Sequence, residues 1–304
     1  MILCGRKPFD TIICLVILCA TLFASAVQGQ ASLPSHDELQ ALLKRMAQQI
    51  AANDKLSQQY TSEELWHNVN FNKDSKKTVD ESAKYENIFV EGLSYRRKIE
   101  QNGKPLEGRA AEEEEKRYDK AVAERRAMSW AEKRHLFQTH TTFELPLDWL
   151  ATLFDNRIIG REQIDGRDTV VVESTPLPNA HPSSQAEQHV LDMKEKTWID
   201  MADVVPARIE VEMLKDHGHV DKSSTFRLEF QRVIDQPGSD GRPERPAWLI
   251  RSSVVHFSGK LLFIKIQGTT EQTWSNYKRF HVDVRFLEDS VQEAPSTDKG
   301  MDKP

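Results

Sequence analysis

The feature that most constrains the fold of this chain is a long series of extended segments separated by turn residues. Asn102-Gly103 and Asp165-Gly166 are dipeptides typical of tight β-hairpin turns, and each stands between two such segments. Because short connections of this kind join neighbouring antiparallel strands, we expect one large antiparallel sheet. The expected strands cover residues 65–71, 82–90, 93–101, 156–164, 168–174, 197–200, 208–212, 226–230, 250–257, 261–267 and 273–279.

An amphipathic helix is predicted before the first strand. Ser35 and Glu38 have the spacing of a capping box, which marks a helix start. Apolar residues then recur at helical spacing on one face, at Leu39, Leu42, Leu43, Met46 and Ile50. This stripe favours packing onto a sheet over membrane binding. The helix is expected to end near residues 53–54.

Residues 107–154 interrupt the β pattern and are interpreted as a helical insertion. Four glutamates at 112–115 precede Lys116 and Arg117 at a spacing of four, which predicts a solvated, charge-rich helix over 107–137. A cation site at these glutamates is the alternative. A short apolar helix is expected over 146–154. Helices at the start and middle of an antiparallel sheet give an α+β fold, whose large curved sheet can form a half-open barrel covered by the helices.

The first residues have the pattern of a cleavable signal peptide over 1–26. Arg6 and Lys7 precede an apolar run at 12–20, and small residues follow at Ala24 and Ala26. The run is shorter than the roughly 20 residues that span a bilayer, and the bulky residues before Cys19 argue against lipidation. The protein is therefore expected to be periplasmic or secreted, with a single β-rich domain at 35–286 and a disordered tail at 287–304.

Composition excludes several classes of function for the processed chain. All three cysteines (Cys4, Cys14 and Cys19) lie in the predicted leader, so disulfides, thiol chemistry and thiolate metal sites are excluded. The formal net charge of -6 argues against nucleic-acid binding. No second apolar run approaches the length of a membrane span, so no transmembrane segment is expected after cleavage.

Motifs for catalysis are missing from the sequence. There is no glycine-rich phosphate loop, no nucleophile elbow and no zinc-protease motif. Candidates for a metal or acid/base site are scattered, and turn or strand-end roles account for them as well: His135, His140, His217, His219, Asp200, Asp203 and Asp283. We therefore predict no enzyme, no metal site and no cofactor.

Large aromatic side chains along the strands suggest a ligand cavity. The candidate residues are Trp66, Phe89, Tyr95, Trp198, Phe226, Phe230, Trp248, Phe263 and Trp274. A closed core is the alternative for any one of them, but together they can line an apolar groove. Alternation along 197–200 places Trp198 and Asp200 on one face of a strand and Ile199 on the other. We predict that Trp198 points inward, beneath the helices.

Several short stretches resemble the periplasmic outer-membrane lipoprotein-sorting (LolA-like) proteins. They are Gly-Arg-Glu-Gln-Ile-Asp-Gly-Arg at 160–167, Thr-Trp-Ile-Asp at 197–200 and Pro-Ala-Arg at 206–208, together with the opening helix and the strand series. The resemblance covers about residues 36–286 and implies an incomplete β-barrel, closed by helices around a hydrophobic cavity. The acidic helix at 107–137 departs from the simplest carriers of that group.

Two functional hypotheses follow. The first is an exported carrier or binding protein that holds lipid, lipoprotein acyl chains or another apolar ligand in the half-barrel. The second is an interaction or sensor module that binds a partner protein of the cell envelope, because charged helices are suited to steering a partner.

Overall fold

The computed structural model describes residues 35–72, 74–133, 136, 152–216, 218, 220–234, 246–261 and 264–279. The predicted leader at 1–26 and the tail at 287–304 lie outside them. The main helices are α2 (His36–Ser57), α3 (Gly108–Ala127) and α6 (Gln185–Val190). The strands are β1 (Tyr60–Phe71), β2 (Lys77–Val90), β3 (Leu93–Gln101), β4 (Lys104–Pro105), β5 (Phe154–Ile164), β6 (Arg167–Pro176), β7 (Met193–Asp200), β8 (Pro206–Met213), β9 (Thr225–Val233), β10 (Ala247–Leu261) and β11 (Ile264–Arg279).

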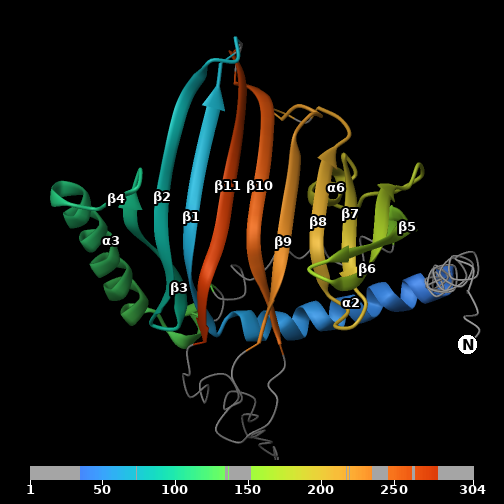
Figure 1. The fold of residues 1–304 in the computed structure, drawn as a ribbon, viewed down its shortest axis with the longest axis horizontal. Helices are drawn as coiled ribbons and strands as arrows, with labels where there is room; N and C mark the ends of the chain where they lie inside the picture. The colour runs from blue at the N-terminus through green and yellow to red at the C-terminus, as the bar shows by residue number, and fades with distance from the viewer. Residues whose placement is uncertain are drawn as a thin grey trace, which may run out of the picture. The chain divides into compact units, whose positions relative to one another are not determined.

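All eleven strands belong to one sheet, in the order β4-β3-β2-β1-β11-β10-β9-β8-β7-β6-β5, and every pairing is antiparallel. Strands that are adjacent in the sheet are also consecutive in the sequence, with one exception, the pairing of β1 with β11. In the described part of the chain β4 and β5 are the two edges, so the sheet is open (Figure 1). The predicted α+β fold with one large antiparallel sheet is confirmed.

Tight turns at three hairpins fix the register of the sheet. Asn102-Gly103 and Asp165-Gly166 join β3 to β4 and β5 to β6, as predicted, and Glu91-Gly92 joins β2 to β3. Both residues of each turn have positive φ, between 50° and 82°. This backbone matches the right-handed twist of the flanking strands, and glycine adopts it without steric cost.

The last strand is longer than the sequence predicts. Residues 261–267 and 273–279 were expected to be separate strands, whereas β11 runs without a break from Ile264 to Arg279. Gly268 lies within it, opposite Asn70 of β1. A Cβ atom on Gly268 would lie 3.0 Å from the backbone oxygen of Val69. Glycine here permits close approach of two backbones and does not mark a turn.

The helix α2 supplies the core on one face of the sheet. It crosses strands between β10 and β5 (Figure 1), and its predicted apolar stripe packs on Val170, Val172 and Ile199. We call this side of the sheet the α2 face. The helix continues past its expected end at 53–54 because Asn53 does not form a turn. Its amide donates to the carbonyl of Trp248 at 2.7 Å and accepts from the Trp248 N–H at 2.7 Å.

The charged helix α3 buries none of its residues. It packs beside β2 and β3 through side chains that project from the sheet. The ring of Tyr118 meets that of Tyr95 edge-on at 5.5 Å, and Arg97 pairs with Glu115 at 2.8 Å. The predicted short helix at 146–154 lies almost entirely outside the described residues.

One carboxyl group on β7 is buried without full hydrogen bonding. Glu195 is 7 % exposed, and its Oε1 accepts from the Thr197 hydroxyl at 2.5 Å. Its Oε2 has no hydrogen-bond partner among the described residues. Burial raises the pKa of Glu195 above its ordinary value, and the Thr197 hydrogen bond opposes this only in part. Because an uncompensated buried charge is costly, the ionised form destabilises the fold.

We expect Glu195→Gln to raise the free energy of unfolding at pH 8 by about 1–3 kcal/mol. A raised folded-state pKa gives stability that is complete below the unfolded pKa and is lost as pH rises through the folded pKa. The gain should therefore shrink towards zero as the pH falls to about 4. Urea denaturation of wild type and variant at several pH values measures it. Glu212→Gln, on the exposed side of β8, is the control. If Glu195→Gln stabilises the protein by the same amount at all pH values, this account is contradicted.

Candidate functional site

A cavity of about 1110 Å³ is lined by the sheet and by the two long helices. Its lining comes from the second half of α2, from α3, from β1–β3 and from β8–β11. These elements are far apart in the sequence, and the β1–β11 pairing brings them together. The volume is slightly above the usual range of about 300–1,000 Å³ for small-molecule sites. It is large enough for an extended apolar ligand.

One wall of the cavity is apolar and belongs to β9, β10 and β11. Phe226, Leu228 and Phe230 are alternate residues of β9, so they point to the same face of the sheet. Leu249 of β10 and Trp274 of β11 extend this wall. Covering apolar side chains with an apolar ligand instead of water lowers the free energy, so this wall favours ligand binding.

A second wall, which we call the arginine wall, is formed by β3 and α3 and includes Arg96. Arg96 binds a buried carboxylate that is not itself part of the lining. Glu64 of β1 is 2 % exposed, and Arg96 of β3 holds it with two hydrogen bonds, from Nε at 2.8 Å and Nη2 at 2.5 Å. Gln272 Nε2 of β11 donates to the same carboxylate at 2.9 Å. The Arg96 guanidinium also stacks 3.3 Å from the centre of the Tyr85 ring. The buried charge of Glu64 is therefore paired and fully bonded, as burial of an ion requires.

The helix α3 adds two more arginines to this wall, Arg117 and Arg125. Arg117 donates to both oxygens of Glu114, at 2.9 and 2.7 Å, and to the carbonyl of Arg96 at 2.6 Å. Its guanidinium lies 4.9 Å from the centre of the Tyr95 ring. The cavity is consequently amphipathic, because aromatic and aliphatic side chains and three guanidinium groups line it together.

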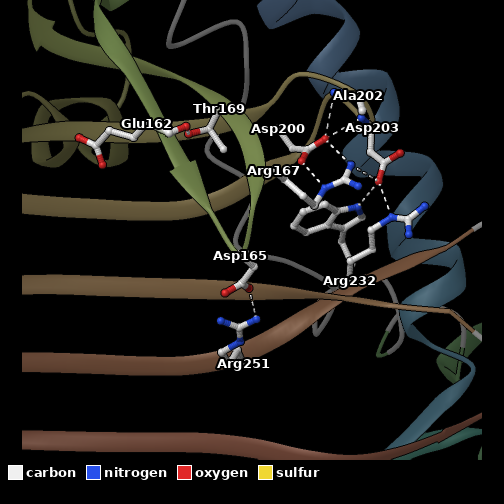
Figure 2. Close-up of polar contacts among 10 residues, drawn as sticks. Glu162, Asp165, Arg167, Thr169, Asp200, Ala202, Asp203, Arg232 and Arg251 are labelled. Atoms are coloured by element: carbon white, nitrogen blue, oxygen red, sulfur yellow. Dashed lines mark hydrogen bonds and ion pairs between the residues drawn. The ribbon is translucent and has the colours of Figure 1, made fainter. Parts of the chain in front are cut away.

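A polar cluster supports the end of the cavity near the β7–β8 turn (Figure 2). Arg167 of β6 donates to both oxygens of Asp200, at 2.6 and 2.7 Å. Asp203 Oδ2 accepts from Arg167 at 3.0 Å, Arg232 at 2.8 Å and the Trp248 indole at 3.0 Å. Because Trp248 lines the cavity, this cluster positions part of its wall.

The turn itself is held by the Asp200 carboxylate. Its Oδ1 accepts the backbone N–H groups of Ala202 at 3.0 Å and Asp203 at 2.8 Å. Burial alone raises the pKa of Asp200, but the bonds from Arg167 and from these two N–H groups outweigh it, so the net pKa lies below its ordinary value. The Asp200 carboxylate is therefore held as an anion at neutral pH, and it fastens the β7–β8 turn to Arg167.

The structure brings most of the nine candidate aromatic residues to one site. The lining of the cavity includes Phe89, Tyr95, Phe226, Phe230, Trp248 and Trp274. Trp66 is half-buried on β1 and does not belong to the lining. Phe263 lies outside the described residues. Whether the six lining residues hold a ligand stays a prediction.

Trp198 does not lie beneath the helices, contrary to the sequence analysis. Its neighbour Ile199 packs against α2, so Trp198 points to the other face of the sheet. It is 5 % exposed there, with its indole N–H donating to Glu162 at 2.8 Å and the Arg208 guanidinium 5.2 Å from its ring. The alternation within 197–200 was correct, and the choice of the inward face was wrong.

The other candidates for chemistry form no site in the described chain. Asp200 and Asp203 are engaged by arginines, as shown above. His135, His140, His217, His219 and Asp283 lie outside the described residues. Among the residues that the structure describes, no group of three His, Cys, Asp or Glu side chains could hold a metal ion.

The arginine wall was missed by the sequence analysis. Glu64 and Arg96 are 32 residues apart, and their contact depends on the pairing of β1, β2 and β3. Arginine and lysine stand on both faces of the β3 sequence, so its pattern does not indicate that Arg96 lines a cavity. Arg117 and Arg125 belong to a helix whose charges predicted only solvation.

Comparisons with known proteins return structures and no sequence relatives. No family model and no curated protein matches the chain. A putative outer membrane lipoprotein-sorting protein domain from Vibrio parahaemolyticus is 14% identical, with 81% of this chain and 96% of that chain covered and a TM-score of 0.33. A DUF1329 family protein from Desulfovibrio piger is 15% identical, with 82% and 99% covered and a TM-score of 0.29. A LolA superfamily protein from Nitrosomonas europaea is 12% identical, with 81% and 99% covered and a TM-score of 0.25.

Two of these three structures carry the description that the sequence resemblance named. At such TM-scores and identities, none of them bears on what this protein binds. Within the described residues, no helix is long and apolar enough to cross a membrane.

Proposed function

We propose that this protein is a binding or carrier protein that holds an acyl chain or a similar apolar ligand in the cavity. The observation that carries the proposal is a volume of about 1110 Å³ lined on one side by Phe226, Leu228, Phe230, Leu249 and Trp274. A packed core would leave no such space, because protein interiors are filled to crystal-like density. Export of the protein stays a prediction, since the leader lies outside the described residues.

Titration with a fluorescent fatty-acid probe, and mass spectrometry of organic extracts of the purified protein, test the proposal directly. Saturable binding at a stoichiometry near one, or a co-purified lipid, is expected. The absence of both saturable binding and a co-purified lipid would overturn the proposal.

We expect Trp274→Ala to weaken probe binding about tenfold, which corresponds to ~1.4 kcal/mol. Trp274 lines the cavity from β11 and is half-buried, so its truncation removes contact area without emptying the core. Trp66→Ala is the matched control. Trp66 is also a half-buried tryptophan, on the adjacent strand β1, but it does not line the cavity. Equal losses for the two variants would show that the probe does not occupy this cavity.

A partner-binding module is the second candidate, and the exposure of α3 favours it. This helix carries many charges and buries no residue, which suits electrostatic steering of another protein. A pull-down from cell-envelope extracts distinguishes the candidates. A stoichiometric protein partner that is lost when the exposed charges of α3 are neutralised would support the second candidate over the first.

A further inference from the structure

Three guanidinium groups line the cavity on the side formed by β3 and α3. They belong to Arg96, Arg117 and Arg125. Two of them already have carboxylate partners, because Arg96 binds Glu64 and Arg117 binds Glu114. Their charges are therefore compensated within the protein.

Arg125 differs from the other two because its partners are neutral. Its Nη1 donates to the carbonyl oxygens of Val90 at 3.4 Å and Leu93 at 3.0 Å, and its Nη2 donates to that of Ser94 at 2.8 Å. It forms no salt bridge with a carboxylate among the described residues. An arginine has five N–H donors, so two remain for another acceptor.

The surroundings of Arg125 make its positive charge costly without a partner. The side chain is half-buried, and desolvation lowers the pKa of its guanidinium from the ordinary value. Its guanidinium lies 5.4 Å from the centre of the Tyr95 ring, which compensates the charge only weakly. An anion in the cavity would remove this cost through charge-assisted hydrogen bonds.

The other charged groups that line the cavity do not supply this anion. Glu124 is next to Arg125 in the chain, but its side chain is 58% exposed and is paired with Lys120 at 3.7 Å. Asp54 lines the cavity from α2, and no ion pair between it and Arg125 is found in the described part of the chain. The arginine wall therefore offers one positive charge that forms no ion pair with a carboxylate of the described lining, in the same cavity as the apolar side chains of β9, β10 and β11.

We propose that Arg125 binds the anionic head group of an amphiphile whose acyl chain lies against β9, β10 and β11. This inference rests on the proposed function and adds the chemical class of the ligand, a single-headed anionic lipid with a carboxylate or phosphate group. The apolar wall receives the chain, and the guanidinium receives the head. A neutral lipid of the same length would leave Arg125 without its partner.

A purely structural role for Arg125 makes different predictions. Its three bonds to the β2–β3 hairpin also fasten α3 to the sheet, so its replacement can lower stability. A structural defect would weaken the binding of charged and neutral ligands alike. A head-group role weakens only the binding of the charged ligand.

The experiment measures the affinity of a fluorescent fatty acid, its methyl ester and a lysophosphatidic acid of the same chain length. Wild type, Arg125→Gln, Arg125→Lys and Arg126→Gln are compared. Arg126 is the matched control, because it is the next residue of α3 and carries the same charge, but it is exposed, pairs with Glu91 and does not line the cavity. Thermal melts establish that each variant is folded.

Wild type should bind at least one of the two acids about tenfold more tightly than the ester, the factor that one charge-assisted hydrogen bond provides. Arg125→Gln should abolish this preference, Arg125→Lys should keep most of it, and Arg126→Gln should leave it intact. Whichever of the two acids binds with the higher affinity identifies the head group as a carboxylate or a phosphate. Added salt should reduce the preference in wild type, which tests the proposal even if Arg125→Gln does not fold.

Two outcomes would overturn the inference, and they differ from failure of the proposed function. If wild type binds the acids and the ester with equal affinity, the anionic head group is excluded, while an apolar ligand in the cavity is still supported. Parallel loss of acid and ester binding in Arg125→Gln would assign the residue a structural role alone. If no probe binds to wild type at all, the proposed function fails first.

Discussion

Asp200→Ala should lower the free energy of unfolding by about 3–5 kcal/mol at neutral pH, the usual cost of removing one partner from a buried ion pair. Asp200 is 1 % exposed and receives two hydrogen bonds from Arg167. Its loss leaves Arg167 with Asp203 as its only carboxylate partner in the described chain. It also frees the backbone N–H groups of Ala202 and Asp203. Urea denaturation at constant pH measures the change.

The same residue predicts a loss of stability in acid. The pKa of Asp200 lies below its ordinary value in the folded protein. A lowered folded-state pKa gives stability that is present above the unfolded pKa and is lost as pH falls through the folded pKa. Between neutral pH and about pH 4 the difference between wild type and Asp200→Asn should therefore be constant, and below that it should narrow.

Asp168→Asn is the control for both measurements. Asp168 belongs to the neighbouring strand and also pairs with an arginine, Arg161, at 2.9 Å, but its side chain is 50% exposed. An exposed pair contributes at most about 1 kcal/mol. If Asp200→Ala costs no more than Asp168→Asn, the cluster of Figure 2 does not hold the β7–β8 turn.

Local patterns were sufficient to predict most of the strands and the first helix. Asn102-Gly103 and Asp165-Gly166 adopt the positive φ values that such turns need, and the apolar stripe of α2 is buried where its spacing placed it. These features depend on residues close together in the sequence, so they are visible before any tertiary contact is known. The same local logic divided the last strand at 268–272, because the place of Gly268 in β11 depends on the backbone of Val69, which is far away in the sequence.

The cavity could be predicted only in part, because the sequence pattern indicates its apolar wall but not its arginine wall. Large aromatic side chains along the expected strands indicated the apolar wall. The arginine wall depends on the pairing of β1, β2 and β3 and on the packing of α3 beside β3, which no local pattern reveals. The buried Glu64 shows the difficulty, since an isolated glutamate on a strand predicts solvent exposure. Its carboxylate is satisfied by Arg96 and Gln272, which come from other strands of the sheet.

The inward face of β7 was misassigned for a similar reason. Alternation in 197–200 separates Trp198 and Asp200 from Ile199, but it does not say which side meets the helices. The prediction that Trp198 points inward relied on Asp200 ending the strand at a turn, so that no charge is buried. The structure buries Asp200 against Arg167, 33 residues away. It also covers Trp198, on the face away from α2, with Glu162 and Arg208.

Trp198→Ala should consequently lower the free energy of unfolding by about 3–5 kcal/mol, because a tryptophan that is 5 % exposed leaves a large void when truncated. The change also removes the hydrogen bond to Glu162 and the ring beneath Arg208. Trp198→Phe retains most of the packing and loses the hydrogen bond, so it should cost less. Denaturant titrations of the two variants measure both effects.

Probe affinity separates this tryptophan from Trp274. Under conditions in which Trp198→Ala is folded, its affinity for the fatty-acid probe should equal that of wild type, because Trp198 lies on the face away from the cavity. Trp274→Ala should show the reverse, with weaker binding and a smaller loss of stability. Two tryptophans on one sheet thus test which face is the ligand side. Loss of probe binding in folded Trp198→Ala, as large as that in Trp274→Ala, would show that the ligand lies against the other face of the sheet.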